Sequence, residues 1–288
     1  MKKIFVPVVS WLEAGGVWLV ERGLGCLSLS TASRFGGWLL RTVGARLGAD
    51  RTARRNLARC FSPAEVEALV PAVWDNLGRT FFEYPHLSRL LREDRVEYVG
   101  LEHLRAAAAA GRGGVLASAH LGNWEVVPFM AEKAGIEAAV MFRAPNNPKV
   151  AAVLARCRSH AEKITFIAKS TRGTKEAFSF LAARKFVGLL IDHRYNRGID
   201  VEFLGGTARI APTAALMALR FRCPILPVRV ERLPDCRMRV TVYPPLALDY
   251  DQPKEEFVAT AMQQAMDVVA GWVRAAPEQW FWMQKLWG

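Results

Sequence analysis

Apolar residues recur at every third or fourth position through much of the first hundred residues, which is the spacing of helices that bury one face. This spacing predicts helices over 32–48, 63–70 and 71–92, and the region shows little strand signal. Ser62 followed by Pro63 marks a helix start, because a serine hydroxyl caps unpaired backbone N–H groups and proline suits the first helical position.

From residue 112 onward the pattern changes, and short apolar runs alternate with helical patterns. The runs predict strands over 113–119, 138–142, 164–167, 186–191, 225–230 and 238–243. The intervening patterns predict helices over 123–134, 148–163, 174–184, 212–221 and 254–274, with a loop before residue 212. Such alternation is typical of an α/β fold with a mostly parallel central sheet flanked by helices.

The N-terminus begins with two lysines and an apolar run over 4–20 that Glu13 interrupts. The run falls slightly short of the roughly 20 apolar residues that a membrane-spanning helix needs, and no convincing signal-peptide cleavage site follows it. It indicates a membrane anchor or an interfacial helix, although an ordinary buried helix shows the same pattern. The expected organisation is a membrane-associating helical region at 1–30, a helical region at 31–98 that packs on the core, and an α/β domain at 99–288.

The composition of the 288 residues, with 51% hydrophobic and 23% charged residues, excludes a disordered chain. The net charge of +12 favours a polyanionic partner, which leaves nucleic acid, an anionic lipid surface, a phosphorylated substrate and an acidic carrier protein as options. The five cysteines are far apart and form no C-x-x-C pair, so they indicate neither a zinc site nor a disulfide framework.

His120 is the strongest candidate for chemistry, because it ends a predicted strand directly before a helix start, and ligands gather at the carboxyl ends of strands in open α/β sheets. With Glu125 in the first helical turn, its carboxylate can accept a hydrogen bond from one His120 ring nitrogen and leave the other as a base. Gly122 permits a tight turn and Asn123 is a natural N-cap. A histidine that merely caps the helix, with Glu125 on the surface, fits the same spacing.

The segment HLGNWE at 120–125 resembles the H-x4-D/E signature of the lysophospholipid and glycerolipid acyltransferases, in the version of the bacterial lipid A biosynthesis (lauroyl/myristoyl) acyltransferase family. Further segments resemble this family in the same order: RRNLARCF at 54–61, GLEH at 100–103, FRAPNNP at 142–148, FVGLLID at 186–192, VEFLGGTARIAPT at 201–213 and PEQWFW at 277–282. The resemblance covers essentially the whole chain. It fails at 283–288, where the family usually has a histidine and arginines and this chain reads MQKLWG.

The resemblance implies transfer of a fatty acyl chain from a thioester, usually on acyl carrier protein, to a hydroxyl of a lipid A precursor, with no metal or cofactor. His120 would act as the general base, and Glu125 would orient it. The residues expected to bind substrate are Asn123, Arg143, Asp192, Arg194, Gly205, Arg209 and Thr213. The expected location is the cytoplasmic face of the inner membrane, and an anionic glycolipid rather than nucleic acid is the expected partner.

Plainer alternatives stay open for several of these residues. Arg143 fits a surface arginine, Asp192 a helix cap, and Gly205 with Gly206 a simple turn. The tryptophans near the C-terminus suit either an interfacial aromatic anchor or core packing. For the function, the alternatives are the same chemistry on another glycolipid or lysophospholipid, and a binding protein without catalysis, for which no RNA-binding motif is visible.

Overall fold

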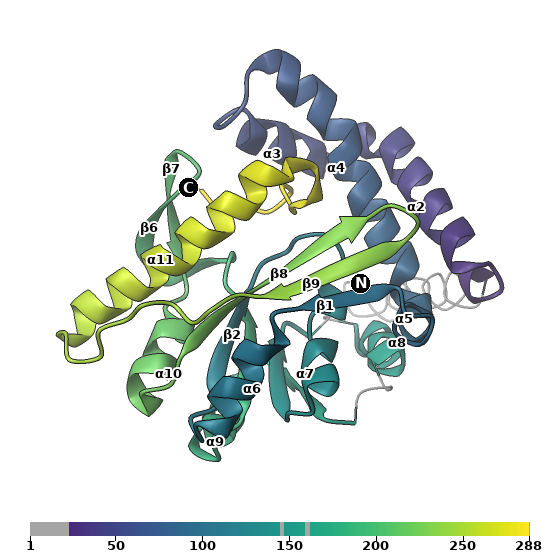
Figure 1. The fold of residues 1–288 in the computed structure, drawn as a ribbon. Helices are drawn as coiled ribbons and strands as arrows, with labels where there is room; N and C mark the ends of the chain where they lie inside the picture. The colour runs from purple at the N-terminus through teal and green to yellow at the C-terminus, as the bar shows by residue number, and fades with distance from the viewer. Residues whose placement is uncertain (1–22, 145–146, 159–161, 288) are drawn as a thin grey trace, which may run out of the picture.

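A seven-stranded sheet flanked by helices forms the centre of the protein in the computed structural model, which describes residues 23–144, 147–158 and 162–287 (Figure 1). The strand order is β1-β9-β8-β2-β5-β3-β4. The strands are β1 (Val96–Val99), β2 (Gly114–Ser118), β3 (Ala138–Phe142), β4 (Ile164–Ala168), β5 (Phe186–Leu190), β8 (Ile225–Leu233) and β9 (Arg237–Val242). All neighbouring strands are parallel except β8 and β9, so the predicted mostly parallel α/β fold is confirmed.

The helices that surround the sheet follow the predicted alternation in most places. They are α2 (Leu29–Val43), α3 (Gly48–Leu57), α4 (Pro63–Glu83), α5 (Leu87–Arg92), α6 (Leu101–Ala109), α7 (Phe129–Ala134), α8 (Pro148–Arg158), α9 (Thr171–Ala182), α10 (Thr213–Phe221) and α11 (Lys254–Ala275). Short 3-10 helices are η1 (Gly44–Arg46), η2 (Tyr84–His86), η3 (Trp124–Val126) and η4 (Pro277–Gln279).

Helix α4 starts where the sequence predicts. The Ser62 side chain accepts the Glu65 backbone N–H, and the Glu65 carboxylate accepts the Ser62 backbone N–H at 2.8 Å, which is a reciprocal capping box. The helix then continues through Pro71 to Glu83, so the prediction of two separate helices at 63–70 and 71–92 is wrong. Proline removes only one hydrogen bond from a helix, and the buried face of α4 runs across it.

Helices α2 and α4 pack against each other at close range along much of their length (Figure 1). A Cβ atom at Gly36 would lie 2.5 Å from the backbone oxygen of Gly78, so only glycine allows this approach. The two helices therefore pack as one unit in the region that precedes the sheet. Strand β1 begins at Val96, so it joins the sheet before the predicted domain boundary at residue 99.

Three strands lie where the sequence shows no strand signal. The edge strand β1 has only one buried residue, so its sequence lacks the alternation of a half-buried strand. The expected loop before residue 212 is instead a two-stranded antiparallel sheet of β6 (Arg194–Phe203) and β7 (Gly206–Ile210). Gly205 forms their turn with a φ of +76°, which supports the plainer interpretation of that glycine.

The tryptophans near the C-terminus are core residues. Trp280, Trp282 and Trp287 expose only 1%, 0% and 3% of their surface, and Trp280 packs edge-on against Trp282 with ring centroids 4.7 Å apart. Core packing is therefore the correct alternative for them.

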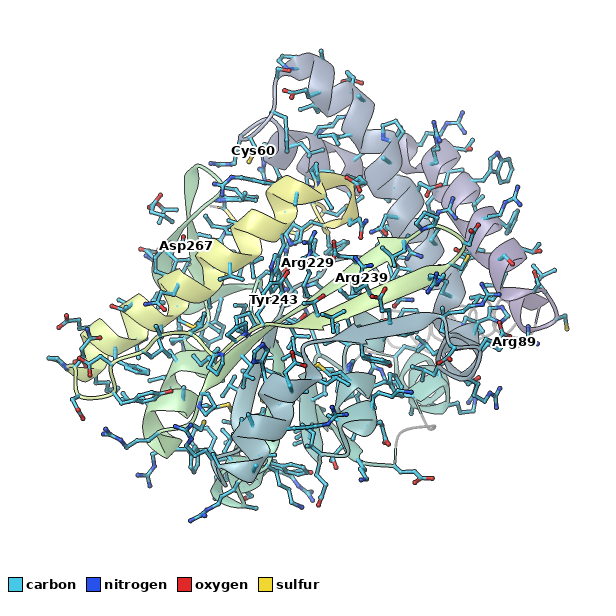
Figure 2. All side chains as sticks on the ribbon, viewed as in Figure 1. Cys60, Arg89, Arg229, Arg239, Tyr243 and Asp267 are labelled. Atoms are coloured by element: carbon cyan, nitrogen blue, oxygen red, sulfur yellow. The ribbon has the colours of Figure 1, made fainter. Side chains whose placement is uncertain are left out.

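Charged side chains cover much of the outer surface. Figure 2 shows Arg239 on β9, where it pairs with Glu97 of the neighbouring strand β1 at 3.1 Å. Within the described ranges, no helix combines the length and the apolar character that a membrane crossing requires. The predicted anchor at 4–20 lies outside the described residues.

Candidate active site

His120 and Asp192 form a pair at the carboxyl ends of two adjacent parallel strands. His120 follows β2, and Asp192 follows β5, which pairs with β2 in parallel. The His120 Nδ1 atom lies 2.8 Å from Asp192 Oδ1, and the His120 backbone N–H donates to Asp192 Oδ2 at 2.9 Å. A ring nitrogen that faces a carboxylate carries the proton, so the other nitrogen, Nε2, is left able to accept one.

Asp192 is fully buried and accepts a further hydrogen bond, from the Trp280 ring N–H at 2.8 Å. Burial by itself raises the pKa of this carboxyl group. The charge of His120 and the hydrogen bonds from His120 and Trp280 outweigh burial and lower the pKa of Asp192 to about 2. The carboxylate therefore stays ionised at neutral pH and can stabilise an imidazolium at His120.

Glu125 is engaged by other residues. Arg158 donates from Nε and Nη2 to its two carboxylate oxygens, each at 2.9 Å, and Tyr84 donates its hydroxyl to Oε1 at 2.6 Å. The predicted hydrogen bond between Glu125 and His120 is therefore wrong, because the carboxylate that bonds the His120 ring is that of Asp192. The expected continuous helix over 123–134 does not form either: η3 ends at Val126, and α7 begins only after Pro128.

The ion pair of Glu125 and Arg158 is almost entirely buried, with side chains 8% and 10% exposed. The Arg158 guanidinium also lies over the rings of Phe142 and Phe166, at 4.8 and 5.0 Å from their centroids. The pair thus joins α8 to the turn after His120 and forms part of the cavity wall beside His120.

A cavity of about 240 Å³ opens beside His120. Residues of the strands β2, β3 and β5 form its floor. The floor and the facing wall are lined by Leu116, Ser118, Ala138, Val140, Gly188, Leu190, Val127 and Met130. All of these but Ser118 lack a polar side-chain group, so the cavity suits a hydrocarbon chain.

Two residues near His120 were missed by sequence analysis. The His193 ring stacks on the His120 ring with centroids 4.9 Å apart, and burial, followed by the charge of His120, lowers the pKa of His193. Lys169 lines the same cavity, and burial of its ammonium group lowers its pKa against the attraction of Asp192. Both residues follow the end of a strand, so the rule that singled out His120 was a signal for them too.

The structure brings only some of the predicted substrate-binding residues to the cavity. Arg143 lines it just after β3, and Asp192 lies behind His120. Asn123 is fully buried outside the cavity, where it caps η3 by accepting the Glu125 backbone N–H at 3.2 Å. A direct substrate contact by Asn123 is therefore contradicted, whereas its predicted capping role is confirmed.

The other four residues lie on or next to the β6–β7 hairpin. Arg194 begins β6, Gly205 lies in the hairpin turn, and Thr213 begins α10. Arg209 on β7 forms a bidentate pair with Asp200 at 2.7 and 2.6 Å. None of the four lines the cavity beside His120, so their part in substrate binding stays a prediction.

Comparisons with known proteins identify the family of the chain. The sequence model of the family described as "Bacterial lipid A biosynthesis acyltransferase" matches residues 2–288. A phosphatidylinositol mannoside acyltransferase of Mycobacterium tuberculosis is 29% identical over 293 residues, which cover 96% of this chain and 88% of the relative. The Mycolicibacterium smegmatis protein of the same name is 27% identical over 257 residues, covering 84% and 81% of the two chains.

A solved structure, the 1-acyl-sn-glycerophosphate (LPA) acyltransferase PlsC from Thermotoga maritima, matches with a TM-score of 0.41 and 12% identity. It covers 88% of this chain and 96% of that chain, but the likeness is too low to support an argument. The family match and the curated relatives define the protein as an acyltransferase. The chain belongs to the bacterial lipid A biosynthesis acyltransferase family.

Proposed function

We propose that the protein transfers a fatty acyl chain from an acyl carrier protein thioester to a hydroxyl group of an anionic glycolipid, with His120 as the general base. The observation that carries the proposal is the hydrogen bond between His120 Nδ1 and Asp192 at the side of an apolar cavity. Asp192, rather than Glu125, orients the ring. Glu125 acts indirectly by fixing the wall of the cavity through Arg158.

In the proposed reaction, His120 Nε2 accepts the proton of the acceptor hydroxyl as the oxygen attacks the thioester carbonyl carbon. A new C–O bond forms, and the carbonyl oxygen becomes an oxyanion. When the carbonyl is restored, the C–S bond breaks, and the leaving thiolate takes the proton from the His120 imidazolium. The products are an ester and a free thiol. A positioned base of this kind contributes about 10²–10⁴-fold to the rate.

The cavity is the proposed site of the acyl chain. Each buried methylene contributes about 0.8 kcal/mol of transfer free energy, so apolar walls can hold a chain without specific contacts. Arg143 and Lys169 line the same cavity, and their positive charges suit the developing oxyanion or a phosphate of the acceptor. Arg194, Arg209, Gly205 and Thr213 are the proposed headgroup contacts on the hairpin side.

The acceptor has two candidates. A lipid A precursor is the first, because the family model that matches the whole chain carries that description. A mannosylated phosphoinositide is the second, because the curated relatives are named for phosphatidylinositol mannoside.

Purified protein incubated with a radiolabelled acyl carrier protein thioester and each acceptor in turn would test this function. We expect label to appear in one acceptor as an ester, and the acceptor that becomes labelled names the substrate. Release of free fatty acid alone, with neither acceptor labelled, would contradict the proposal. The same mixture without the protein is the control for non-enzymatic transfer.

We also propose that the protein works on the cytoplasmic face of the inner membrane and contacts lipid through one side of α2. Phe35 and Trp38 are 43% and 59% exposed there, and their rings stack with centroids 5.8 Å apart. Exposed Arg34 and Arg41 lie on the same helix. Aromatic rings flanked by arginines suit the boundary between anionic headgroups and acyl chains. No nucleic acid partner is proposed.

A further inference from the structure

A fully buried carboxylate, Glu83, lies at the end of α4 and outside the acyl cavity. It accepts a hydrogen bond from Ser33 of α2 at 2.6 Å and one from the Asn123 side-chain amide at 2.9 Å. Arg232 of β8 donates to it from Nη1. Through these hydrogen bonds Glu83 links α2, β8 and the turn that follows His120.

Arg232 ties the same region together from the sheet side. Its Nε donates to the Asn76 side-chain oxygen at 2.8 Å, and its Nη2 donates to the Thr80 hydroxyl at 2.9 Å. Its backbone N–H donates to the Gln279 side-chain oxygen at 2.7 Å, and Gln279 returns a hydrogen bond to the Arg232 backbone oxygen at 3.1 Å. The guanidinium and the backbone of one residue therefore join α4, β8 and η4.

This network ends on the turn that carries the base. The Thr80 hydroxyl lies 2.8 Å from the Gly122 backbone oxygen, and the Gly122 N–H donates to the Gln279 backbone oxygen at 2.9 Å. Gly122 has a φ of +49°, so the turn holds a conformation that favours glycine. Asn123 is fixed at both ends, because its amide donates to Glu83 and its oxygen accepts from Glu125.

Stability alone gives little reason for a buried charge pair at this place. Removing two charges from water is costly, and apolar residues of similar volume often make a protein as stable or more stable. What a buried pair with directed hydrogen bonds supplies is fixed geometry. Neither Glu83 nor Arg232 lines the cavity, and the side-chain contacts described above lead from both of them to the turn at 120–125.

We propose that Glu83 and Arg232 are positioning residues, which hold the turn at 120–125 in the geometry that aims His120 at the acceptor hydroxyl. The link runs through Asn123 and the Gly122 carbonyl. The inference rests on the proposed function, in which His120 is the base. It also gives the helical region before the sheet a part in catalysis, because Glu83 and Thr80 belong to α4.

Steady-state kinetics of Glu83→Gln and Asn123→Ala test this, with Ser33→Ala as the matched control. Ser33→Ala removes a hydrogen bond from the same carboxylate but on the side away from the turn. We expect kcat to fall on the order of 10- to 100-fold in Glu83→Gln and Asn123→Ala, since small displacements of a catalytic group have effects of this size. KM should change little, and the Ser33→Ala enzyme should keep near wild-type kcat.

The double variant distinguishes a shared route from two separate defects. Adding Asn123→Ala to Glu83→Gln should lower kcat little further, because both substitutions break the same link, the hydrogen bond between Glu83 and Asn123. Arg232→Lys should recover part of the kcat lost in Arg232→Met, since lysine keeps the charge next to Glu83. Equal kcat in Glu83→Gln and Ser33→Ala enzymes of equal melting temperature would overturn the proposal, and so would fully additive losses.

Hydrogen–deuterium exchange separates this inference from the proposed function, because it needs no substrate. The peptide that spans 118–126 should exchange faster in Glu83→Gln and Asn123→Ala than in the wild type, and it should not do so in Ser33→Ala. Unchanged exchange in that peptide would overturn the positioning role even if acyl transfer were established. Faster exchange in a protein that transfers no acyl group would overturn only the proposed function.

Discussion

Asp192 contacts His120 twice, through the ring and through the backbone N–H. In Asp192→Asn the amide group no longer enforces the tautomer that leaves Nε2 unprotonated, and it cannot stabilise an imidazolium. We expect kcat to fall by up to about 10²–10⁴-fold, the contribution of the base that Asp192 orients. Single-turnover assays with purified enzyme measure this loss. A fall of less than tenfold would show that Asp192 has no such role.

The same substitution has a predicted effect on stability. The folded-state pKa of Asp192, about 2, lies below its ordinary value of 3.8, so the ionised group stabilises the fold above about pH 4. That contribution, about 2 kcal/mol, is lost as the pH falls from 4 toward 2. Urea unfolding across this range should therefore show a weaker pH dependence in Asp192→Asn than in the wild type. Identical pH dependence would contradict the assigned environment.

Glu125→Gln should act on stability more than on proton transfer by His120. Breaking a buried ion pair typically costs about 3–5 kcal/mol, because the remaining charge stays buried and unpaired. We expect a lower free energy of unfolding in urea, with partial recovery when Arg158→Met is added. The loss of kcat should be smaller than in Asp192→Asn, since Asp192 holds the ring. A loss of kcat as large as that of Asp192→Asn would mean that Glu125 acts on His120 directly.

The sequence identified His120 but not the residue that hydrogen-bonds to its ring. His120 was found because ligand-binding residues gather at the carboxyl ends of strands in open α/β sheets. Its partner was not assigned, because Asp192 lies 72 residues further along the chain, and the pairing of β2 with β5 cannot be read from local periodicity. Glu125 was chosen instead because local spacing does not show that Tyr84 and Arg158 engage its carboxylate.

Among the secondary-structure elements, α2 is the one proposed to contact the membrane. Replacing Phe35 and Trp38 together by serine should weaken sedimentation with anionic lipid vesicles, because the exposed rings supply the apolar contact. The free energy of unfolding should change little, since both side chains are exposed. Replacing Tyr195, which is 48% exposed on β6, by serine is the control. Equal vesicle binding by the wild type and the α2 variant would place the lipid contact elsewhere.

The elements themselves were predicted best where burial is strong. Four strands are so buried that their sequences are mainly apolar, and each was expected near its observed place: β2, β3, β5 and β8. The hairpin of β6 and β7 was missed, because the start of β6 is exposed and polar. Such a strand is fixed by pairing with its neighbour, which periodicity does not report.

At the scale of the whole molecule, the net charge of +12 bears on the choice of acyl donor. Attraction between a basic enzyme and an acidic carrier protein raises the rate of encounter and is screened by salt. We expect kcat/KM with an acyl carrier protein thioester to fall steeply as salt rises. The value with a short uncharged acyl thioester should change much less. The same salt dependence with both donors would argue against the carrier protein.

The central claim is that His120 is the base of an acyltransferase, and turnover of His120→Ala tests it most directly. In this variant Asp192 keeps the hydrogen bonds from the residue 120 backbone N–H and from the Trp280 ring, so the protein should fold, which a melting curve and a circular dichroism spectrum would check. We expect kcat for acyl transfer from the thioester to fall by about 10²–10⁴-fold in the folded variant. Turnover near the wild-type value in folded His120→Ala protein would contradict it.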